Sequence, residues 1–246
     1  MKNDWEKISF MRTATPSPRP TLRGISSMAT RQLLAELLAM YALRSNCVIA
    51  IESVGGVDAV KRVQAGESFD LVFLASEAID SMIVVGHIDA RSKLDLVRCG
   101  VAVAVRAGAQ RPDISSEKAV RQAVLAARSI SYSTGPSGVA LAKLFEKWGI
   151  AEIIRERLVQ PPPGTSVGAL VARGEVELGF QQLSELIHVQ GIALVGPLPP
   201  EIQVTTTFSA GIGAGSTQAP AARDLLDFMA SARAVDAKRR QGMEPA

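Results

Sequence analysis

The stretch Tyr132-Ser133-Thr134-Gly135-Pro136-Ser137-Gly138 is where the fold is most readily inferred. It follows a short β-like run, 128–132, and opens a helical pattern over 139–148. Small hydroxylated residues and glycines at a strand-to-helix turn leave backbone N–H groups uncovered at the positive end of the helix dipole. Such a turn can seat an anion, although serine and threonine are also ordinary helix N-caps. Because the pattern recurs at several turns along the chain, it is stronger evidence for anion binding than any single turn.

Strand-like and helical patterns alternate on both sides of this turn. On its N-terminal side we expect strands at 22–26, 48–52, 70–74 and 94–106, and helices at 28–44, 55–65, 76–85 and 117–127. On its C-terminal side we expect strands at 176–180, 192–195 and 203–212, and helices from 166, over 181–189 and over 219–234. This order is typical of an α/β protein with mainly parallel sheets and helices on their faces.

The same pattern divides the chain into two βα lobes joined by two crossing strands. We expect lobe 1 to comprise 21–103 plus 205–234, and lobe 2 to comprise 104–204. Residues 1–20 end in alternating prolines and read as an extended leader, and 235–246 read as a polar, frayed tail. Two lobes of this kind predict a ligand cleft between them.

Composition limits the class of ligand. The 246 residues carry a formal net charge of +3, their basic residues are scattered, and only 4% are aromatic. Nucleic-acid binding needs a concentrated basic face, so we expect a small anionic ligand and no nucleic acid. No pair of Cys47, Cys99, His87 and His188 has metal-ligand spacing, and no nucleotide motif occurs, so we expect neither metal nor cofactor.

The N-terminal residues contain no apolar run of the length that a secretory signal needs. No segment reaches the roughly 18 apolar residues of a membrane span. We therefore expect a cytoplasmic protein without a membrane span, or a periplasmic one if the natural start differs from Met1.

Ligands of open parallel sheets bind beyond the carboxyl ends of the strands, where helices begin. The turns at those ends carry hydroxyls, amides and bare backbone, with no lysine or arginine within them. One interpretation is a series of ordinary N-caps, and the other is a neutral cage of donors for an oxyanion or carboxylates. The candidate ligand-binding residues are Ser26, Ser27, Met28, Gly55, Gly56, Ser76, Ser133, Thr134, Gly135, Ser137, Ser166, Gln181 and Gln182.

The order of elements and these turns resemble the type 2 periplasmic-binding fold, and in particular the molybdate-binding proteins of ABC transporters. The resemblance covers about 21–234 and rests on Ser26-Ser27, on 69–76 (FDLVFLAS) and on 170–180 (LVARGEVELGF). It implies a tetrahedral oxyanion bound between the lobes, with Ser27 and Ser76 as the best-matched ligands. The chain departs from that pattern where the family usually has a tyrosine, because Gly179-Phe180 is followed by Gln181-Gln182.

The runs 25–30, 52–58, 132–138 and 179–185 look more like a side branch of that family, which includes bacterial aconitate isomerase. The resemblance implies an isomerase that interconverts cis- and trans-aconitate by allylic proton transfer without a cofactor. Such chemistry needs donors for carboxylates and for an enolate-like intermediate, and a base within reach. Glu52, at a strand end beside Gly55-Gly56, is our candidate base if partial desolvation raises its pKa. Tyr132 and Ser27 are the next candidates, and Arg31 or Arg98 could counter a substrate carboxylate.

A second hypothesis from a different class is a non-catalytic binding protein for molybdate, tungstate or a small carboxylate. Without an export signal, delivery of a solute to an ABC permease is not expected of this chain. Under either hypothesis we expect the lobes to close on the ligand by bending near Ala102–Ala104 and Thr205–Thr207.

Overall fold

The computed structural model describes residues 20–162 and 164–246, so most of the expected leader lies outside the described residues. Its strands are β1 (Thr21–Ser27), β2 (Val48–Val54), β3 (Leu71–Ala75), β4 (Leu94–Arg106), β5 (Ile130–Tyr132), β6 (Leu178–Gln182), β7 (Ile192–Pro197), β8 (Thr205–Ile212) and β9 (Glu244–Pro245). Its α-helices are α1 (Arg31–Ala42), α2 (Gly56–Gln64), α3 (Ser76–Val84), α4 (Glu117–Ala126), α5 (Pro136–Lys147), α6 (Ala151–Ile154), α7 (Val167–Arg173), α8 (Leu183–Leu186), α9 (Ala219–Ala230) and α10 (Val235–Arg240).

Lobe 1 is a three-layer α/β unit. Its strands lie in the order β2-β1-β3-β8-β4, with β1 parallel to β2 and β3, and β8 antiparallel to β3 and β4. Helices α1, α9 and α10 cover one face through a core that includes Leu33, Leu225 and Ala237. Helices α2 and α3 cover the other face through Val63 and Ile79. Parallel pairing brings the carboxyl ends of β1, β2 and β3 to one edge.

Lobe 2 repeats this layering around a smaller sheet. Strand β5 is parallel to β6, and both β6 and β7 are antiparallel to β4. The side chain of Phe145 on α5 packs against Phe180 on β6 in the core of one face. On the other face, Leu186 of α8 packs against Ala102 and Ala104 of β4.

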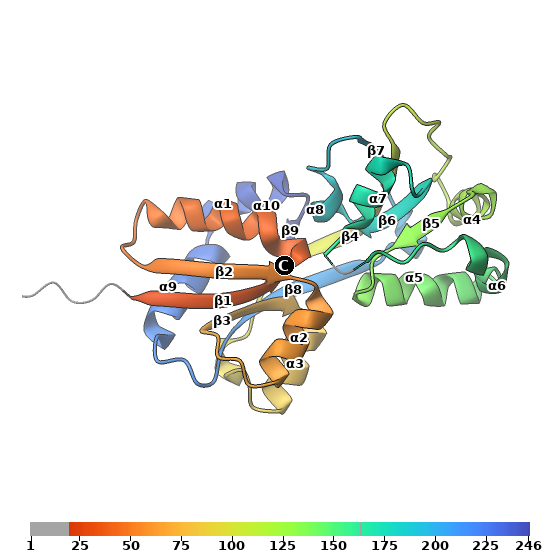
Figure 1. The fold of residues 1–246 in the computed structure, drawn as a ribbon. Coiled ribbons are helices and arrows are strands. Elements are labelled where there is room, and N and C mark those ends of the chain that lie inside the picture. The colour runs from red at the N-terminus through yellow and green to blue at the C-terminus, as the bar shows by residue number, and fades with distance from the viewer. Residues whose placement is uncertain (1–19, 163) are drawn as a thin grey trace, which may run out of the picture.

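The two lobes are joined by one long strand and one return segment (Figure 1). Residues Leu94–Gly100 of β4 pair with β8 in lobe 1, and Val101–Ala104 pair with β6 in lobe 2. The chain returns at Gln203, whose Oε1 accepts a hydrogen bond from the Val101 N–H at 3.0 Å. Its Nε2 donates to the Leu198 carbonyl, so the Gln203 side chain holds β4 and the return segment together where both pass between the lobes.

The segment 235–246 does not fray as expected. It forms α10 and then β9, which pairs with β4 at Val97 and Arg98. Met243 is 1% exposed and belongs to the lobe-1 core, with Ala237. Two isolated apolar side chains in a polar segment are too weak a pattern to predict this, but they suffice once a neighbouring strand supplies hydrogen bonds.

Several boundaries also shift. The expected first helix begins as a 3-10 turn, η1 (Met28–Thr30). The strand expected over 176–180 lies at Leu178–Gln182, and the helix expected over 181–189 shortens to α8. Gln181 and Gln182 stay in the sheet because each pairs with a β4 residue, which a local pattern does not reveal.

Candidate functional site

The lobe-1 side of the site is built at the end of β1. Ser27 is 7% exposed, and its Oγ has no hydrogen-bond partner among the described residues. A Cβ placed on Gly56 would lie 3.7 Å from that of Ser27, so the start of α2 lies beside the serine. The hydroxyls of Ser26 and Ser53 share a hydrogen bond of 2.8 Å and hold the ends of β1 and β2 together. The Ser27 hydroxyl is therefore a buried polar group free to meet a ligand.

The lobe-2 side begins at the turn between β5 and α5. The hydroxyls of Ser133 and Ser137 share a hydrogen bond of 2.9 Å, and Ser137 is buried. Gly138 lets the chain pass so closely that a Cβ there would come within 1.6 Å of the Ser133 carbonyl oxygen. Pro136 takes the first helical position, where its missing N–H costs nothing. The start of α5 is thus built from residues without bulky polar side chains, and the N–H groups of Gly138 and Val139 donate to the Gly135 carbonyl.

Gln182, at the end of β6, links the lobes. Its Nε2 donates to Thr206 Oγ1 of β8 at 2.8 Å. Its Oε1 has no partner among the described residues, although the side chain is 3% exposed. A buried amide oxygen without a partner costs free energy of roughly 1–3 kcal/mol. After Ser27 Oγ, Gln182 Oε1 is thus the second buried polar atom at the lobe junction without a partner among the described residues. A hydrogen-bond donor on a ligand would satisfy it.

The structure brings these residues together through two contacts between the lobes. The 3-10 turn η1, which follows Ser27, lies against α8, which follows Gln182. Helix α5, which follows Ser133, lies against β8. The ends of β1, β5 and β6 therefore meet at the junction, as the sheet topology predicts.

Two candidates have hydroxyls that are already occupied. Ser166 Oγ accepts a hydrogen bond from the Ala169 N–H and is an ordinary N-cap of α7. Ser76 Oγ donates to Asp95 at 3.4 Å, and Asp95 also accepts from Ser209 at 2.6 Å. Thr134 is exposed, while Met28 and Gly135 are partly buried. None of these five residues has a buried side-chain N or O atom without a hydrogen-bond partner among the described residues.

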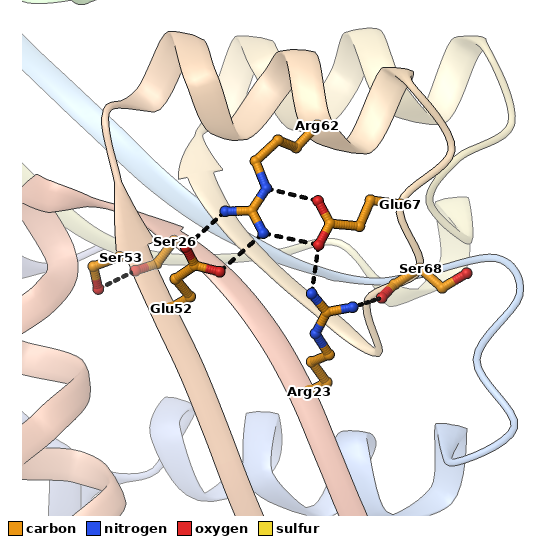
Figure 2. A network of polar contacts seen from close by, with 7 residues as sticks. All are labelled: Arg23, Ser26, Glu52, Ser53, Arg62, Glu67 and Ser68. Atoms are coloured by element: carbon orange, nitrogen blue, oxygen red, sulfur yellow. Dashed lines mark hydrogen bonds and ion pairs between the residues drawn. The ribbon is translucent and has the colours of Figure 1, made fainter. Parts of the chain in front are cut away.

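Glu52 does not have the environment expected of a desolvated base. Figure 2 shows both of its carboxylate oxygens bound by Arg62, at 2.8 and 2.9 Å. Arg62 also pairs with Glu67, which in turn binds Arg23. The Glu52 side chain is 53% exposed. The hydrogen bond from Arg62 holds its pKa below the usual range, so the expected raised pKa is wrong.

The structure gives Tyr132, another candidate base, a packed position, and gives the candidate counter-ions Arg31 and Arg98 exposed positions. Tyr132 packs edge-on against Phe145, with ring centroids 5.9 Å apart, and burial raises its pKa. Arg98 donates to the Pro245 carbonyl at 3.2 Å, and Arg31 is exposed.

Among the described residues, the carboxyl group with a raised pKa is that of Glu185. It is partly buried on α8, and burial raises its pKa to about 7, although a hydrogen bond from Gln181 Nε2 opposes the shift. Sequence reasoning missed it because Glu185 follows no strand directly. No local signal marked it, because Gln181 lies on strand β6 and Glu185 on helix α8, and only the fold brings the two side chains together.

Two surface hollows lie elsewhere, both on lobe 1. One of about 790 Å³ follows β2 and α1 and includes Glu52 and Ser53. The other, of about 400 Å³, is lined by Phe69, His87 and Ser216. Neither contains a lobe-2 residue, so the candidate site is defined by buried polar groups rather than by either hollow. Within 20–162 and 164–246, no group of His, Cys, Asp and Glu could hold a metal ion, and no helix is long and apolar enough to cross a membrane.

The strand order, the crossing strand β4 and the site at the lobe junction define a type 2 periplasmic-binding fold. Comparison with solved structures agrees. A periplasmic molybdate-binding protein of Azotobacter vinelandii matches with a TM-score of 0.75, at 20% identity, over 90% of this chain and 98% of that one. A sulfate-binding protein of Mycobacterium tuberculosis matches with a TM-score of 0.74, at 16% identity, over 93% and 88% of the two chains.

Within that fold, the chain belongs to the family described as bacterial extracellular solute-binding proteins, which matches residues 22–244. An aconitate isomerase from a Pseudomonas species is 35% identical over 236 residues, which cover 93% of this chain and 89% of that protein.

Proposed function

We propose that this protein is an isomerase that interconverts cis- and trans-aconitate. The observation that carries the proposal is the 35% identity to an aconitate isomerase over nearly the whole of both chains. The site is compatible with this substrate, because the neutral donors and N–H groups at the lobe junction suit carboxylates.

The buried polar groups favour a ligand with both acceptors and donors. The hydroxyl of Ser27 can donate to a carboxylate, whereas Gln182 Oε1 can only accept. A protonated carboxyl or a bound water would meet that acceptor, and a fully ionised oxyanion would not. We propose that Ser27 and Gln182 bind the substrate, together with the Ser133–Ser137 turn.

The test is to incubate the purified protein with cis-aconitate in deuterated buffer and to follow the vinyl proton by NMR. We expect the trans isomer to form, with deuterium at an allylic carbon. No conversion over hours at high protein concentration would contradict the proposal.

A second candidate function is non-catalytic binding of an oxyanion, which the fold shared with molybdate- and sulfate-binding proteins favours. Ligand binding to the folded state raises the melting temperature. A large thermal shift with molybdate or sulfate and none with aconitate would support this candidate.

A further inference from the structure

The carboxylate of Glu185 is held in a defined orientation. Gln181 Oε1 accepts a hydrogen bond of 3.1 Å from the Gly168 N–H, which fixes the amide against the start of α7. The opposite end of that amide donates to Glu185 Oε1 at 2.8 Å. Because Gln181 is only 4% exposed, the amide has little freedom to turn away. One carboxylate oxygen is therefore occupied, and Oε2 has no hydrogen bond among the described residues.

Glu185 also lies where the lobes meet. Helix α8 begins directly after Gln182 and lies against η1 of lobe 1, which begins directly after Ser27. Glu185 is thus on the short helix that directly follows Gln182 and contacts the turn that follows Ser27. No lysine, arginine or histidine forms an ion pair with it within 20–162 and 164–246. A partly buried carboxylate without a counter-ion costs stability, which is typical of functional sites.

On the proposed function, we infer that Glu185 is the general base that moves the allylic proton. The Glu185 carboxylate removes a proton from the methylene carbon of cis-aconitate. The electron pair left on that carbon delocalises over the adjacent double bond and over the substrate carboxylate attached to the far carbon of that bond. After its carboxyl proton exchanges with solvent, Glu185 delivers a proton, or a deuteron in deuterated buffer, to the former vinyl carbon, where a new C–H bond forms. The double bond has moved by one position, and no electrons are gained or lost.

The pKa of about 7 suits this role, because a base is most effective when its pKa is near the working pH. Strands β4 and β6 and the turn η1 pack against α8 and carry few titratable or charged groups. Strand β4 carries Asp95, Cys99 and two arginines, of which Arg98 binds the Pro245 carbonyl. Burial raises the pKa of the Cys99 thiol and keeps it neutral near pH 7. Strand β6 and η1 carry no ionisable side chain.

The experiment compares Glu185→Gln with Glu185→Asp and with Glu152→Gln as a matched control. Glu152 is an exposed carboxylate of lobe 2 that pairs with Arg155. We expect Glu185→Gln to lower kcat by on the order of 10²–10⁴-fold while the aconitate-induced thermal shift persists. Glu185→Asp retains the charge and should show intermediate turnover, and Glu152→Gln should match the wild type.

The pH dependence gives a readout that a structural role would not move. We expect wild-type kcat/KM to fall about tenfold per pH unit below about 7, because the base must be deprotonated. Residual turnover in Glu185→Gln should lack this limb. His188, just beyond α8, binds Gln241, and the limb should persist in His188→Asn.

Wild-type protein that does not convert aconitate would contradict the proposed function, and the inference with it. If the wild type converts aconitate but Glu185→Gln stays within threefold of it, only the base assignment fails. Loss of turnover in Glu52→Gln but not in Glu185→Gln would return the role to Glu52. If Glu185→Gln does not fold, Glu185→Asp with wild-type turnover and an unchanged pH limb would overturn the inference.

Discussion

At the scale of single residues, the most telling atoms are those that the fold leaves without a partner. Ser27 Oγ, Ser131 Oγ and Gln182 Oε1 are buried side-chain atoms without a hydrogen bond among the described residues. Folded proteins satisfy most such groups, because each costs roughly 1–3 kcal/mol. Two of the three, Ser27 Oγ and Gln182 Oε1, lie where the lobes meet. Hydrogen bonds to a ligand bound there can offset this cost.

We expect Ser27→Ala to weaken aconitate binding by about tenfold or more while leaving the free energy of unfolding unchanged or raised. The reason is that the mutation removes a buried hydroxyl that makes no bond in the free protein. Binding can be measured by calorimetry, and stability by urea unfolding.

The matched control is Ser92→Ala. Ser92 is equally buried, but its Oγ accepts from the Ile212 N–H at 2.8 Å and donates to the Asp89 carbonyl. This variant should lose about 1–3 kcal/mol of stability without losing affinity. If Ser27→Ala lost stability and kept its affinity for aconitate, while Ser92→Ala lost affinity and kept its stability, the role given to Ser27 would be contradicted.

At the scale of elements, the β5–α5 turn depends on one glycine. Gly138→Ala should destabilise the protein by on the order of 3 kcal/mol, because its Cβ would overlap the Ser133 carbonyl oxygen and the clash is with backbone. Thermal and urea unfolding measure the loss.

The control for that prediction is Gly135→Ala in the same turn. A Cβ there would meet nothing within 4 Å, and Gly135 has a φ of −83°, which alanine adopts freely. This variant should unfold within about 0.5 kcal/mol of the wild type. Equal losses in the two variants would show that the close approach does not determine the turn.

The C-terminal elements illustrate what local patterns miss. We expect Met243→Ala to cost about 2–5 kcal/mol, because Met243 is buried in the lobe-1 core beside β9. Glu244→Ala, one residue further and exposed, should cost about 0.5 kcal/mol or less. Urea unfolding of both variants decides whether 235–246 belongs to the lobe-1 fold or is the frayed tail first expected.

At the scale of the whole molecule, the lobes are coupled through β4 and the return segment at Gln203. A globular chain of this length has a radius of gyration of about 18 Å, and two open lobes exceed that value. We expect saturating aconitate to lower the radius of gyration measured by small-angle X-ray scattering, whereas Ser27→Ala should need about tenfold more aconitate for the same compaction. No compaction of the wild type would contradict closure.

We predict that the hinge lies slightly before the positions first expected. Ala102 and Ala104 already pair with β6 and lie wholly buried in lobe 2. Gly100 and Gln203 lie at the level where the pairing of β4 passes from β8 to β6. Bending costs least where few hydrogen bonds between paired strands are strained, so we place the hinge at Gly100 and Gln203.

The sequence by itself determined the alternation of strands and helices, the division into lobes and the turns that face the junction. These follow from short-range properties: apolar periodicity, glycine and proline at turns, and hydroxyls at strand ends. The strand β4 was predicted at its observed bounds for this reason. The polar ends of β1, β5 and β6 could likewise be predicted, because parallel strands bring their carboxyl ends to one edge.

Only the tertiary structure decided which candidate carboxylate is exposed and which is buried. Glu52 and Glu185 both stand near a strand end, and nothing local distinguishes them. An arginine ten residues away pairs with Glu52 and lowers its pKa, whereas packing between α8, β4 and η1 buries Glu185 and raises its pKa. Desolvation and ion pairing depend on what other segments place around a group, so they are properties of the assembled lobes rather than of the sequence near each residue.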